Sequence, residues 1–421
     1  MPTPGPRLLA TALAVGLAGP ALGQTLFWST QAQPIEETQA MREQVLAGFE
    51  GGAVDYQASD PGPWLTRLQA ETQTGSGTIA VLGALHGDFA GVAGDLSDLS
   101  GAAIDAGGVL PALMDLGKLG GDEQKYIPWM QATYVMAANV KALEHLPEGL
   151  DLDALTYDQF VEWMTKLAAE TGGPKFGFPA GPQGLKHRFF QGYLLPAYTG
   201  SMVTEFRSAG AEAAWEMFRN LWTVTSPAST NYGFMQEQLL TEEVWVAFDH
   251  TARLAEAFNQ RPTDFVAFPA PSGPAGRAFM PVVAGMAVPA TAPDPAASAA
   301  LIDYMLRPET QVATLRATSF FPVVEVEMPD DMPAAVQAGL AIAAMTSAPD
   351  ALPALLPIGL GDLGGQFNQV YIDTFERIIL GSQDIRAVLD SQAEALRALM
   401  EQAGAPCWAP DAASDGPCPV N

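Results

Sequence analysis

Short apolar runs alternate with amphipathic stretches through the first part of the chain, and this alternation constrains the fold more than any other feature. Strand, helix, strand, helix and strand are predicted in that order over residues 25–29, 34–49, 53–57, 64–73 and 78–82. Such an order is typical of a parallel β-sheet with helices on its faces. Right-handed crossovers place the loops that follow the strands at one edge of the sheet, where ligands bind in open α/β proteins. The sequence therefore predicts an α/β fold with a ligand site at the strand ends.

Two further α/β regions follow along the chain. The second carries predicted strands and helices at 134–138, 156–170, 176–178, 211–222 and 244–248. The third opens with a crossing rich in proline and glycine at 268–277. Strands are then predicted at 282–288 and 320–324, and helices at 295–306 and 329–397. The last of these helices has an interruption at 359–365. The 421 residues are enough for two or three domains, each able to bury a hydrophobic core.

The charge balance excludes several classes of partner. The chain has 47 acidic and 20 basic residues, a formal net charge of −27, and no run of basic residues. Binding to nucleic acid or to an anionic membrane surface needs clustered Lys and Arg, so neither is expected. Hydrophobic residues make up 48% of the chain, which excludes a disordered acidic segment. No segment after the N-terminal region has 18 uninterrupted apolar residues, so the mature protein is expected to be soluble.

Residues 1–23 are predicted to be a secretory signal peptide. A positive charge, an apolar stretch over 8–18 and the small residues Ala21 and Gly23 lead to a cleavage site before Gln24. The alternative is an ordinary hydrophobic helix at the N-terminus of an intracellular protein. No cysteine follows the cleavage site, so no lipid anchor is expected there. Export without an anchor predicts a location in the periplasm.

Cys407 and Cys418 are the only cysteines, and both lie near the C-terminus. An exported protein meets an oxidising environment, so a disulfide between them is predicted, which would pin the tail 406–421. With two cysteines and no histidine nearby, a zinc cluster lacks ligands. Neither a metal nor another cofactor is expected.

Six stretches occur in an order that is similar to the pattern of one protein family. They are YIPWMQATYVMAANVKAL, LTYDQFVEWMTKLA, KFGF, VWVAFDHTARLAEAF, FPAPSGPAGR and LIDYMLRPETQ, at 126–143, 155–168, 175–178, 244–258, 268–277 and 301–311. With this ordered set the chain resembles the family 1 extracellular solute-binding proteins of ABC importers, the group that includes maltose-binding protein. Two positions depart from the family pattern: Tyr157 stands where the family has Trp, and Thr241-Glu242-Glu243 stands where it has Gly-Lys. The resemblance covers nearly all of the mature chain.

The resemblance implies two α/β lobes joined by a hinge of crossing strands, which is the type II periplasmic binding protein fold. The first and second parts of lobe 1 would be 25–131 and 269–319, and those of lobe 2 would be 132–268 and 320–405. The crossings between the lobes would lie near Gln131, Phe268 and Phe320. A ligand would bind in the cleft and hold the lobes closed.

Lobe 1 offers candidate ligand-binding residues after its predicted strands and at the first crossing. They are Trp28, Gln31, His86, Asp88, Trp129 and Gln131. A Trp indole presents an apolar face to a sugar ring and one N–H donor, and an ionised Asp accepts strong hydrogen bonds from sugar hydroxyls. The structural alternatives are a core position for Trp28, a loop-capping role for Asp88, and hinge packing for Trp129 and Gln131.

Lobe 2 offers Asp249, His250 and Arg253, the densest polar group after any predicted strand. Asp and Arg together can present an acceptor and a donor to one pair of sugar hydroxyls. The alternative is a helix cap by Asp249 with an internal ion pair to Arg253 four residues later. Weaker candidates are His187 and the pair Gln366 and Phe367, whereas Trp163, Trp215 and Trp222 are expected in the core.

The resemblance implies a periplasmic protein, expected as a monomer, that binds a carbohydrate and delivers it to the membrane permease of an ABC importer. Alternative ligands are a polyol, a glycerol phosphodiester, a polyamine or a metal chelate. A glycosidase would need two carboxylates facing each other across a sugar, and Asp88 and Asp249 are residues of the right type. Because the chain has no Gly-x-Ser-x-Gly elbow, no His-Glu-x-x-His motif and no P-loop, no enzymatic activity is expected.

Overall fold

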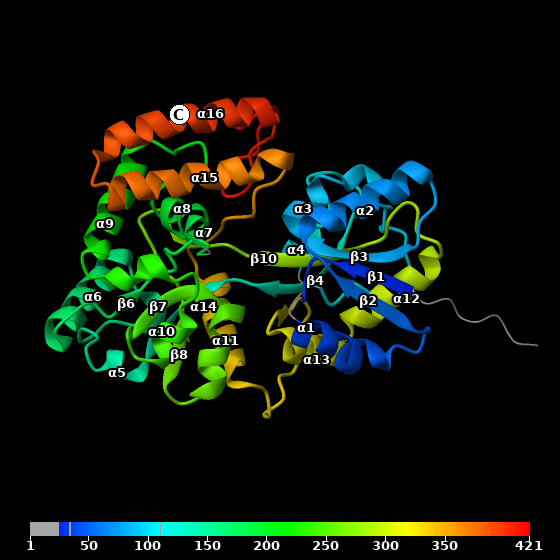
Figure 1. Ribbon diagram of the computed structural model, residues 1–421, viewed down its shortest axis with the longest axis horizontal. Coiled ribbons are helices and arrows are strands. Elements are labelled where there is room, and N and C mark those ends of the chain that lie inside the picture. The colour runs from blue at the N-terminus through cyan, green and yellow to red at the C-terminus, as the bar shows by residue number, and fades with distance from the viewer. Residues whose placement is uncertain (1–24, 33–34, 110, 183) are drawn as a thin grey trace, which may run out of the picture.

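The chain folds into two α/β bodies that lie side by side, each around its own β-sheet (Figure 1). This computed structural model describes residues 25–32, 35–109, 111–182 and 184–421. The signal peptide predicted at 1–23 lies outside the described residues. The body with the six-stranded sheet is called lobe 1 below, and the body with the four-stranded sheet is called lobe 2. The predicted two-lobe α/β fold is therefore confirmed.

Lobe 1 is built on a sheet with the strand order β11-β4-β10-β3-β1-β2. The strands are β1 (Thr25–Ser29), β2 (Val54–Ala58), β3 (Ile79–Leu85), β4 (Ile127–Ala132), β10 (Val282–Ala287) and β11 (Phe321–Pro322). Strand β1 pairs parallel with β2 and β3, as the alternating pattern predicts, whereas β10 is antiparallel to β3 and β4. The helices of this lobe are α1 (Ile35–Ala40), α2 (Pro61–Thr74), α3 (His86–Ala90), α4 (Pro111–Leu116), α12 (Pro295–Leu306) and α13 (Pro308–Thr318).

Lobe 2 is built on a sheet with the order β6-β7-β5-β8 and a separate parallel pair, β12-β9. The strands are β5 (Tyr134–Asn139), β6 (Phe176–Gly177), β7 (Val246–His250), β8 (Phe265–Phe268), β9 (Arg277–Phe279) and β12 (Ala351–Pro353). The helices are α5 (Val140–Leu143), α6 (Tyr157–Thr171), α7 (Lys186–Phe189), α8 (Leu195–Thr199), α9 (Ala209–Trp222), α10 (Gln236–Leu240), α11 (Thr251–Gln260), α14 (Ala338–Ser347), α15 (Gly364–Phe375) and α16 (Ile385–Ala403). Shorter π-helical and 3₁₀ turns are Met41–Val45, Leu46–Gly48, Ala93–Asp95, Leu152–Ala154, Phe190–Leu194, Pro227–Asn231, Ala334–Gln337, Gly361–Leu363 and Glu376–Leu380.

Helix α6 illustrates how the local sequence sets the bounds of an element. The Thr156 hydroxyl accepts a hydrogen bond from the Gln159 N–H at 3.3 Å, and the Gln159 side chain accepts one from the Thr156 N–H at 2.9 Å, which is a capping box. Gly172 ends the helix with φ 79°, a left-handed conformation that favours glycine. The apolar face, with Trp163 fully buried, packs into the core of lobe 2. The predicted helix at 156–170 is thus confirmed.

Two predicted strands end later than their sequence patterns indicate. Strand β3 continues through Leu85, because the small residues Gly83 and Ala84 pair with β10 across the sheet. Strand β7 likewise covers Val246–His250 instead of 244–248. His86 and Asp88, expected in the loop after the first of these strands, therefore lie in α3. Asp249 and His250, expected after the second, lie in β7 itself. Strand β12 is a further difference, since its region was predicted to be helical.

The chain crosses between the lobes at Thr133, which joins β4 to β5, and at Met280–Pro281, which joins β9 to β10. The Thr133 hydroxyl donates a hydrogen bond to the Met280 carbonyl oxygen at 2.8 Å, so the two crossings lie side by side. The Tyr193 hydroxyl lies 2.8 Å from the same Thr133 oxygen. Because β8 and β9 both pack within lobe 2, we propose that the return to lobe 1 follows Met280, whereas the sequence predicts it near Phe268.

The third crossing follows β11. Strand β11 pairs antiparallel with β4, and Val323 and Val324 are buried in the core of lobe 1. The chain has joined lobe 2 by Ala335, which is buried in that core. We propose that the lobes divide at these three crossings, with the hinge made of the strands that meet there.

The C-terminal tail is closed into a loop by a disulfide and is fixed to lobe 2 through Asp411. Cys407 and Cys418 form the predicted disulfide. The buried Asp411 carboxylate accepts hydrogen bonds from the backbone N–H groups of Met202, Val203 and Thr204 at 2.7–3.0 Å. In the part of the chain that the structure describes, no helix has the length and apolar composition of a membrane span.

Candidate functional site

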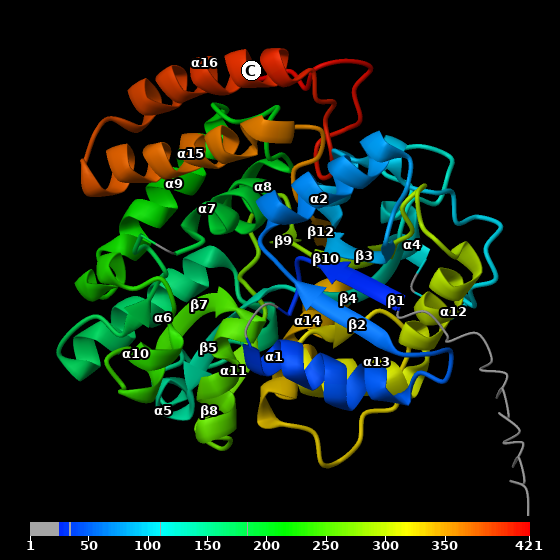
Figure 2. The same ribbon diagram turned by 45° about the vertical axis from the view of Figure 1, so that its right-hand side comes forward.

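A cavity of about 430 Å³ lies between the two lobes and is called the inter-lobe cavity below. Lobe 1 lines it with α2, the end of β3 and α3, and lobe 2 lines it with α7, the segment 356–361 and the start of α15. The start of α15 lies near α3 in Figure 1 and near α2 in Figure 2. The polar side chains of the lining are Gln69 and Asp88 from lobe 1 and Arg188 and Asn368 from lobe 2. A mostly apolar hollow with a few converging polar groups is typical of a small-molecule site.

Asp88 is the predicted ligand-binding residue that lines this cavity. It lies in the first turn of α3, where one carboxylate oxygen accepts a hydrogen bond from the Leu85 N–H at 3.3 Å. Burial raises the pKa of Asp88, whereas the Leu85 N–H and the charge of Arg188 lower it. The loop-capping role and a place in the cavity therefore occur together. The second carboxylate oxygen is available to accept a hydrogen bond from a ligand.

Arg188 and Asn368 form the polar part of the opposite wall. The Arg188 guanidinium donates to the Gln191 side-chain oxygen at 3.3 Å, and the Gln191 amide donates to the Asn368 side-chain oxygen at 3.0 Å. This chain of contacts holds residues from α7 and α15 in one wall. Sequence analysis missed both lining residues, although each is adjacent to a residue that it named, His187 and Phe367.

His86 and His187 are buried beside the cavity but do not line it. The His86 ring lies 2.8 Å from the Tyr126 hydroxyl, and burial lowers the pKa of His86 to about 4. Burial, followed by the charges of Arg188 and Lys186, lowers the pKa of His187 to about 3. Both rings are therefore neutral at pH 7 and pack within their own lobes.

The Asp249 group is occupied by contacts inside lobe 2. Asp249 is fully buried and accepts hydrogen bonds from the N–H groups of Met235 at 2.9 Å and His250 at 2.8 Å, with Arg253 at 3.9 Å. Burial raises the pKa of Asp249 to about 6, although Arg253 and the two N–H groups lower it. The Arg253 guanidinium donates to the Gly233 carbonyl oxygen at 3.0 Å. The structure therefore has the predicted alternative ion pair, and none of these residues lines the inter-lobe cavity.

His250, and not Asp249, caps the next helix. Its ring nitrogen Nδ1 accepts a hydrogen bond from the Ala252 N–H at 3.3 Å at the start of α11. Burial, followed by the charge of Arg253, lowers the pKa of His250 to about 3. This nitrogen is thus engaged with the backbone.

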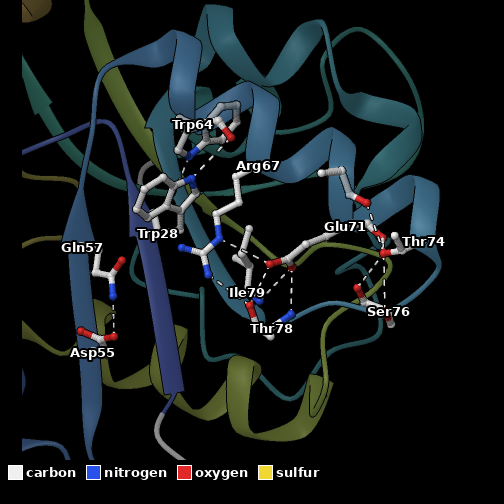
Figure 3. A network of polar contacts seen from close by, with 11 residues as sticks. Trp28, Asp55, Gln57, Trp64, Arg67, Glu71, Thr74, Ser76, Thr78 and Ile79 are labelled. Atoms are coloured by element: carbon white, nitrogen blue, oxygen red, sulfur yellow. Dashed lines mark hydrogen bonds and ion pairs between the residues drawn. The ribbon is translucent and has the colours of Figure 1, made fainter.

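Trp28 and Gln31 lie at the end of β1, outside the lining of the inter-lobe cavity. Trp28 and Trp64 exchange hydrogen bonds, since each indole N–H donates to the carbonyl oxygen of the other residue (Figure 3). The Arg67 guanidinium lies 4.8 Å from the Trp28 ring centroid. Trp28 lines a separate surface hollow with residues of α1 and with Gln57 of β2. Of this pair, it is Trp64 that contributes to the inter-lobe cavity.

Trp129 and Gln131 pack at the hinge side of lobe 1. Trp129 is fully buried, with its ring centroid 5.2 Å from that of Phe27. The Gln131 amide donates to the Pro322 carbonyl oxygen at 2.8 Å and so links β4 to β11. These contacts correspond to the hinge-packing alternative. Gln366 is exposed and Phe367 is buried against Trp408, so neither lines the cavity.

The described residues include no group of three or more His, Cys, Asp or Glu side chains placed to hold a metal ion. Asp88 and Asp249 do not share the inter-lobe cavity, so the carboxylate pair that a glycosidase would need has no geometric support there. The chemistry that the cavity offers is hydrogen bonding by one carboxylate, one guanidinium and two amides, together with apolar contact.

Comparisons with known proteins agree with this architecture. Residues 32–312 match the family model described as "Bacterial extracellular solute-binding protein". The GacH receptor of Streptomyces glaucescens GLA.O, solved with acarbose, is 17% identical at a TM-score of 0.66, covering 89% of this chain and 98% of that one. UgpB from Mycobacterium tuberculosis in complex with glycerophosphocholine is 19% identical at a TM-score of 0.69, and the match covers 90% of this chain and 99% of that one. Maltose-bound MalE3 of T. maritima is 16% identical at 0.69, covering 89% and 99%. No curated protein sequence matches the chain.

Proposed function

The chain belongs to the bacterial extracellular solute-binding proteins, and from that membership we propose that it binds a sugar or oligosaccharide between its lobes and delivers it to the permease of an ABC importer. The observation that carries this proposal is the inter-lobe cavity, whose polar groups come from both lobes. Two similar structures are described as complexes with acarbose and with maltose, which supports a carbohydrate.

The lining suits a ligand rich in hydroxyl groups. Asp88 can accept hydrogen bonds, Arg188 can donate them, and the amides of Gln69 and Asn368 can do both. Charge-assisted hydrogen bonds of the first two are about twice as strong as neutral ones. The partly exposed Leu65 and Leu85 and the exposed Pro61 supply apolar surface for the faces of a sugar ring, whereas Trp64 is buried behind them.

Closure would couple binding to transport. A ligand that contacts Asp88 of lobe 1 and Arg188 of lobe 2 at once makes those contacts only when the lobes are close together. It therefore shifts the equilibrium toward the closed form by its differential affinity for that form. The permease would then distinguish the loaded protein by its closed shape. No catalytic step is part of this proposal.

The alternative ligands are a polyol, a glycerol phosphodiester and a polyamine. The complex of UgpB with glycerophosphocholine supports the second of these. A polyamine is the least suited, because the described residues of the cavity lining include one carboxylate, Asp88, opposed by the guanidinium of Arg188. Calorimetry with spermidine, glycerophosphocholine and disaccharides separates these ligands.

The location and the assembly are proposed with the function. We expect cleavage before Gln24, release into the periplasm without a lipid anchor, and a monomer. Mass spectrometry of the exported protein and size-exclusion chromatography with light scattering check these expectations. A mature mass that still includes residues 1–23 would contradict the first.

A thermal-shift panel on the mature protein tests the proposed function. A ligand at about 100 times its Kd stabilises the folded state by about 2.7 kcal/mol, which raises Tm by several degrees. Small-angle scattering of the same sample should show a more compact particle with the ligand. The proposal fails if no carbohydrate in the panel raises Tm.

A further inference from the structure

The Arg188 guanidinium is left with little to bind inside the protein. It lines the inter-lobe cavity, and its one hydrogen bond within the described residues is the 3.3 Å contact with the Gln191 side-chain oxygen. A guanidinium has five N–H donors, so most of its donors remain available. Asp88, the carboxylate of the opposite wall, lies beyond ion-pair distance and interacts with it only through space.

The other arginines of the described chain are better satisfied. Each has a carboxylate within ion-pair distance, a backbone carbonyl acceptor, or two side-chain oxygens as acceptors. The buried Arg277, for example, donates to the Ala270 carbonyl oxygen at 2.7 Å. This contrast occurs in a chain with 47 acidic and 20 basic residues, where carboxylates are plentiful. Among the described residues, no carboxylate lies within ion-pair distance of Arg188, although Asp88 faces it across the cavity.

Arg188 differs from its cationic neighbour Lys186, which has a carboxylate partner, Glu376, at 3.9 Å. Lys186 lies on the same helix, and its ammonium group donates to the Ala180 carbonyl oxygen at 3.0 Å. His187 between them stays neutral, because burial and these two cations lower its pKa to about 3. A charged group that loses water without gaining an acceptor costs free energy, so closure of the lobes over Arg188 needs a partner for it.

We propose that the ligand carries an anionic group, a carboxylate or a phosphate, that binds to Arg188 while its hydroxyl groups bind to Asp88 and Asn368. This inference rests on the proposed function and narrows it to acidic sugars and phosphorylated polyols. The planar guanidinium matches two oxygens of a carboxylate or phosphate at once, which a neutral hydroxyl cannot reproduce. The separation of Asp88 and Arg188 onto opposite walls keeps the anion away from the carboxylate.

Isothermal titration calorimetry of the mature protein with matched pairs tests the inference. The pairs are galacturonate and galactose, glucuronate and glucose, and glycerol 3-phosphate and glycerol, extended to the corresponding disaccharides. We expect the acidic member of at least one pair to bind tenfold or more tightly than its neutral partner. Its affinity should fall as sodium chloride is raised, because salt screens the charge pair. The pair that responds distinguishes a carboxylate from a phosphate.

Variants of Arg188 test whether this residue causes the preference for the acidic member of a pair. Arg188→Gln should abolish the preference for the acidic member, and Arg188→Lys should keep part of it, since it retains the charge without the planar fork. Arg316→Gln, which changes an arginine of α13 outside the cavity, is the matched control and should leave the preference intact. Thermal unfolding checks that each variant is folded. If Arg188→Gln does not fold, the smaller preference expected of Arg188→Lys tests the inference instead.

Three results would overturn the inference. If the neutral members bind as tightly as the acidic ones or more tightly, and Arg188→Gln does not change this, the ligand has no anionic group at Arg188. The proposed binding of a sugar would still hold. An equal loss of affinity for acidic and neutral members in Arg188→Gln would mean that Arg188 draws the lobes together through Asp88. Absence of binding by every compound would overturn the proposed function as well.

Discussion

Trp28 and Trp64 donate their indole N–H groups to each other's carbonyl oxygen atoms, at 3.4 Å and 3.2 Å (Figure 3). This reciprocal pair ties the end of β1 to the first turn of α2, the helix that carries Trp64 and Gln69 into the inter-lobe cavity. The position of one cavity wall therefore depends on a residue, Trp28, that does not line it.

We expect Trp28→Phe and Trp64→Phe each to lower the free energy of unfolding by about 1 kcal/mol, because each removes one hydrogen bond and keeps an aromatic ring. Urea denaturation followed by circular dichroism measures this. Trp245→Phe is the control, since the Trp245 indole N–H has no hydrogen-bond partner in the described structure. Losses no larger than that of Trp245→Phe would show that the reciprocal pair does not stabilise the fold.

Asp88→Asn should weaken ligand binding about ten- to a hundredfold, because a neutral amide replaces a charge-assisted acceptor that is worth about 1.5–3 kcal/mol. Calorimetry with the best ligand of the panel measures the change. Asp95→Asn, a nearby lobe 1 carboxylate outside the inter-lobe cavity, is the control. Equal affinity of Asp88→Asn and the unmodified protein would remove Asp88 from the binding site.

Much of the fold could be predicted because the pattern is local. The helix at 156–170 follows from a cap, an apolar face and a terminating glycine, and the helix at 295–306 matches α12 in full. The parallel pairing of the first three strands follows from their alternation with helices. The order of six stretches along the chain then indicated the family, which the match over 32–312 confirms.

The site was harder to predict, because it depends on where strands end. Two more residues of β7 turn Asp249 from a loop residue into a buried one that accepts the Met235 N–H. Arg188 lies on a helix of four residues, too short to show periodicity. It shares a wall with Asn368, which lies far along the sequence on α15, and only the tertiary structure brings them together.

Acid should destabilise the fold through its buried histidines. The pKa values are lowered from 6.5 to about 4 for His86 and to about 3 for His187 and His250. The unfolded chain then binds more protons below pH 6.5, so the free energy of unfolding falls as the pH is lowered from 6.5 toward 3. Three carboxyl groups act in the opposite direction, because burial raises the pKa of Glu37 from 4.5 to about 7, that of Asp249 from 3.8 to about 6, and that of Asp88 above its usual value.

We therefore expect each histidine to lower the free energy of unfolding by on the order of 1–2 kcal/mol between pH 7 and pH 5, partly offset by the three carboxyl groups. Urea denaturation at the two pH values measures the net change. His250→Gln should reduce the pH dependence, since it removes one of the titrating groups. A pH dependence that is the same in His250→Gln and in the unmodified protein would contradict the assignment of a neutral buried ring to His250.

The disulfide of the tail should stabilise a cavity wall as well as the fold. The Leu355 N–H donates to the Ala409 carbonyl oxygen at 2.9 Å, just before the segment 356–361 that lines the inter-lobe cavity. Replacing Cys407 and Cys418 together by Ser removes a bridge with a sequence separation of 11 residues, which the chain-entropy model values at about 2–3 kcal/mol. We expect faster amide hydrogen exchange in 355–361 and a lower Tm.

Asp411→Asn is the matched comparison, because it weakens the attachment of the tail to lobe 2 and keeps the disulfide loop within the tail. The variant should also speed exchange in 355–361, through loss of the charge-assisted bonds to the 201–204 turn. Unchanged exchange in both variants would mean that the segment holds its place without the tail.

The contact between the Thr133 hydroxyl and the Met280 carbonyl oxygen limits how the lobes can move. Because two of the three crossings are hydrogen-bonded to each other, we expect the lobes to open mainly by rotation about an axis through these crossings. A ligand that extends along this rotation axis can be longer without forcing the lobes apart, whereas a ligand that extends across the axis cannot. We therefore expect the protein to accept oligosaccharides of different lengths only where the added residues extend along this axis.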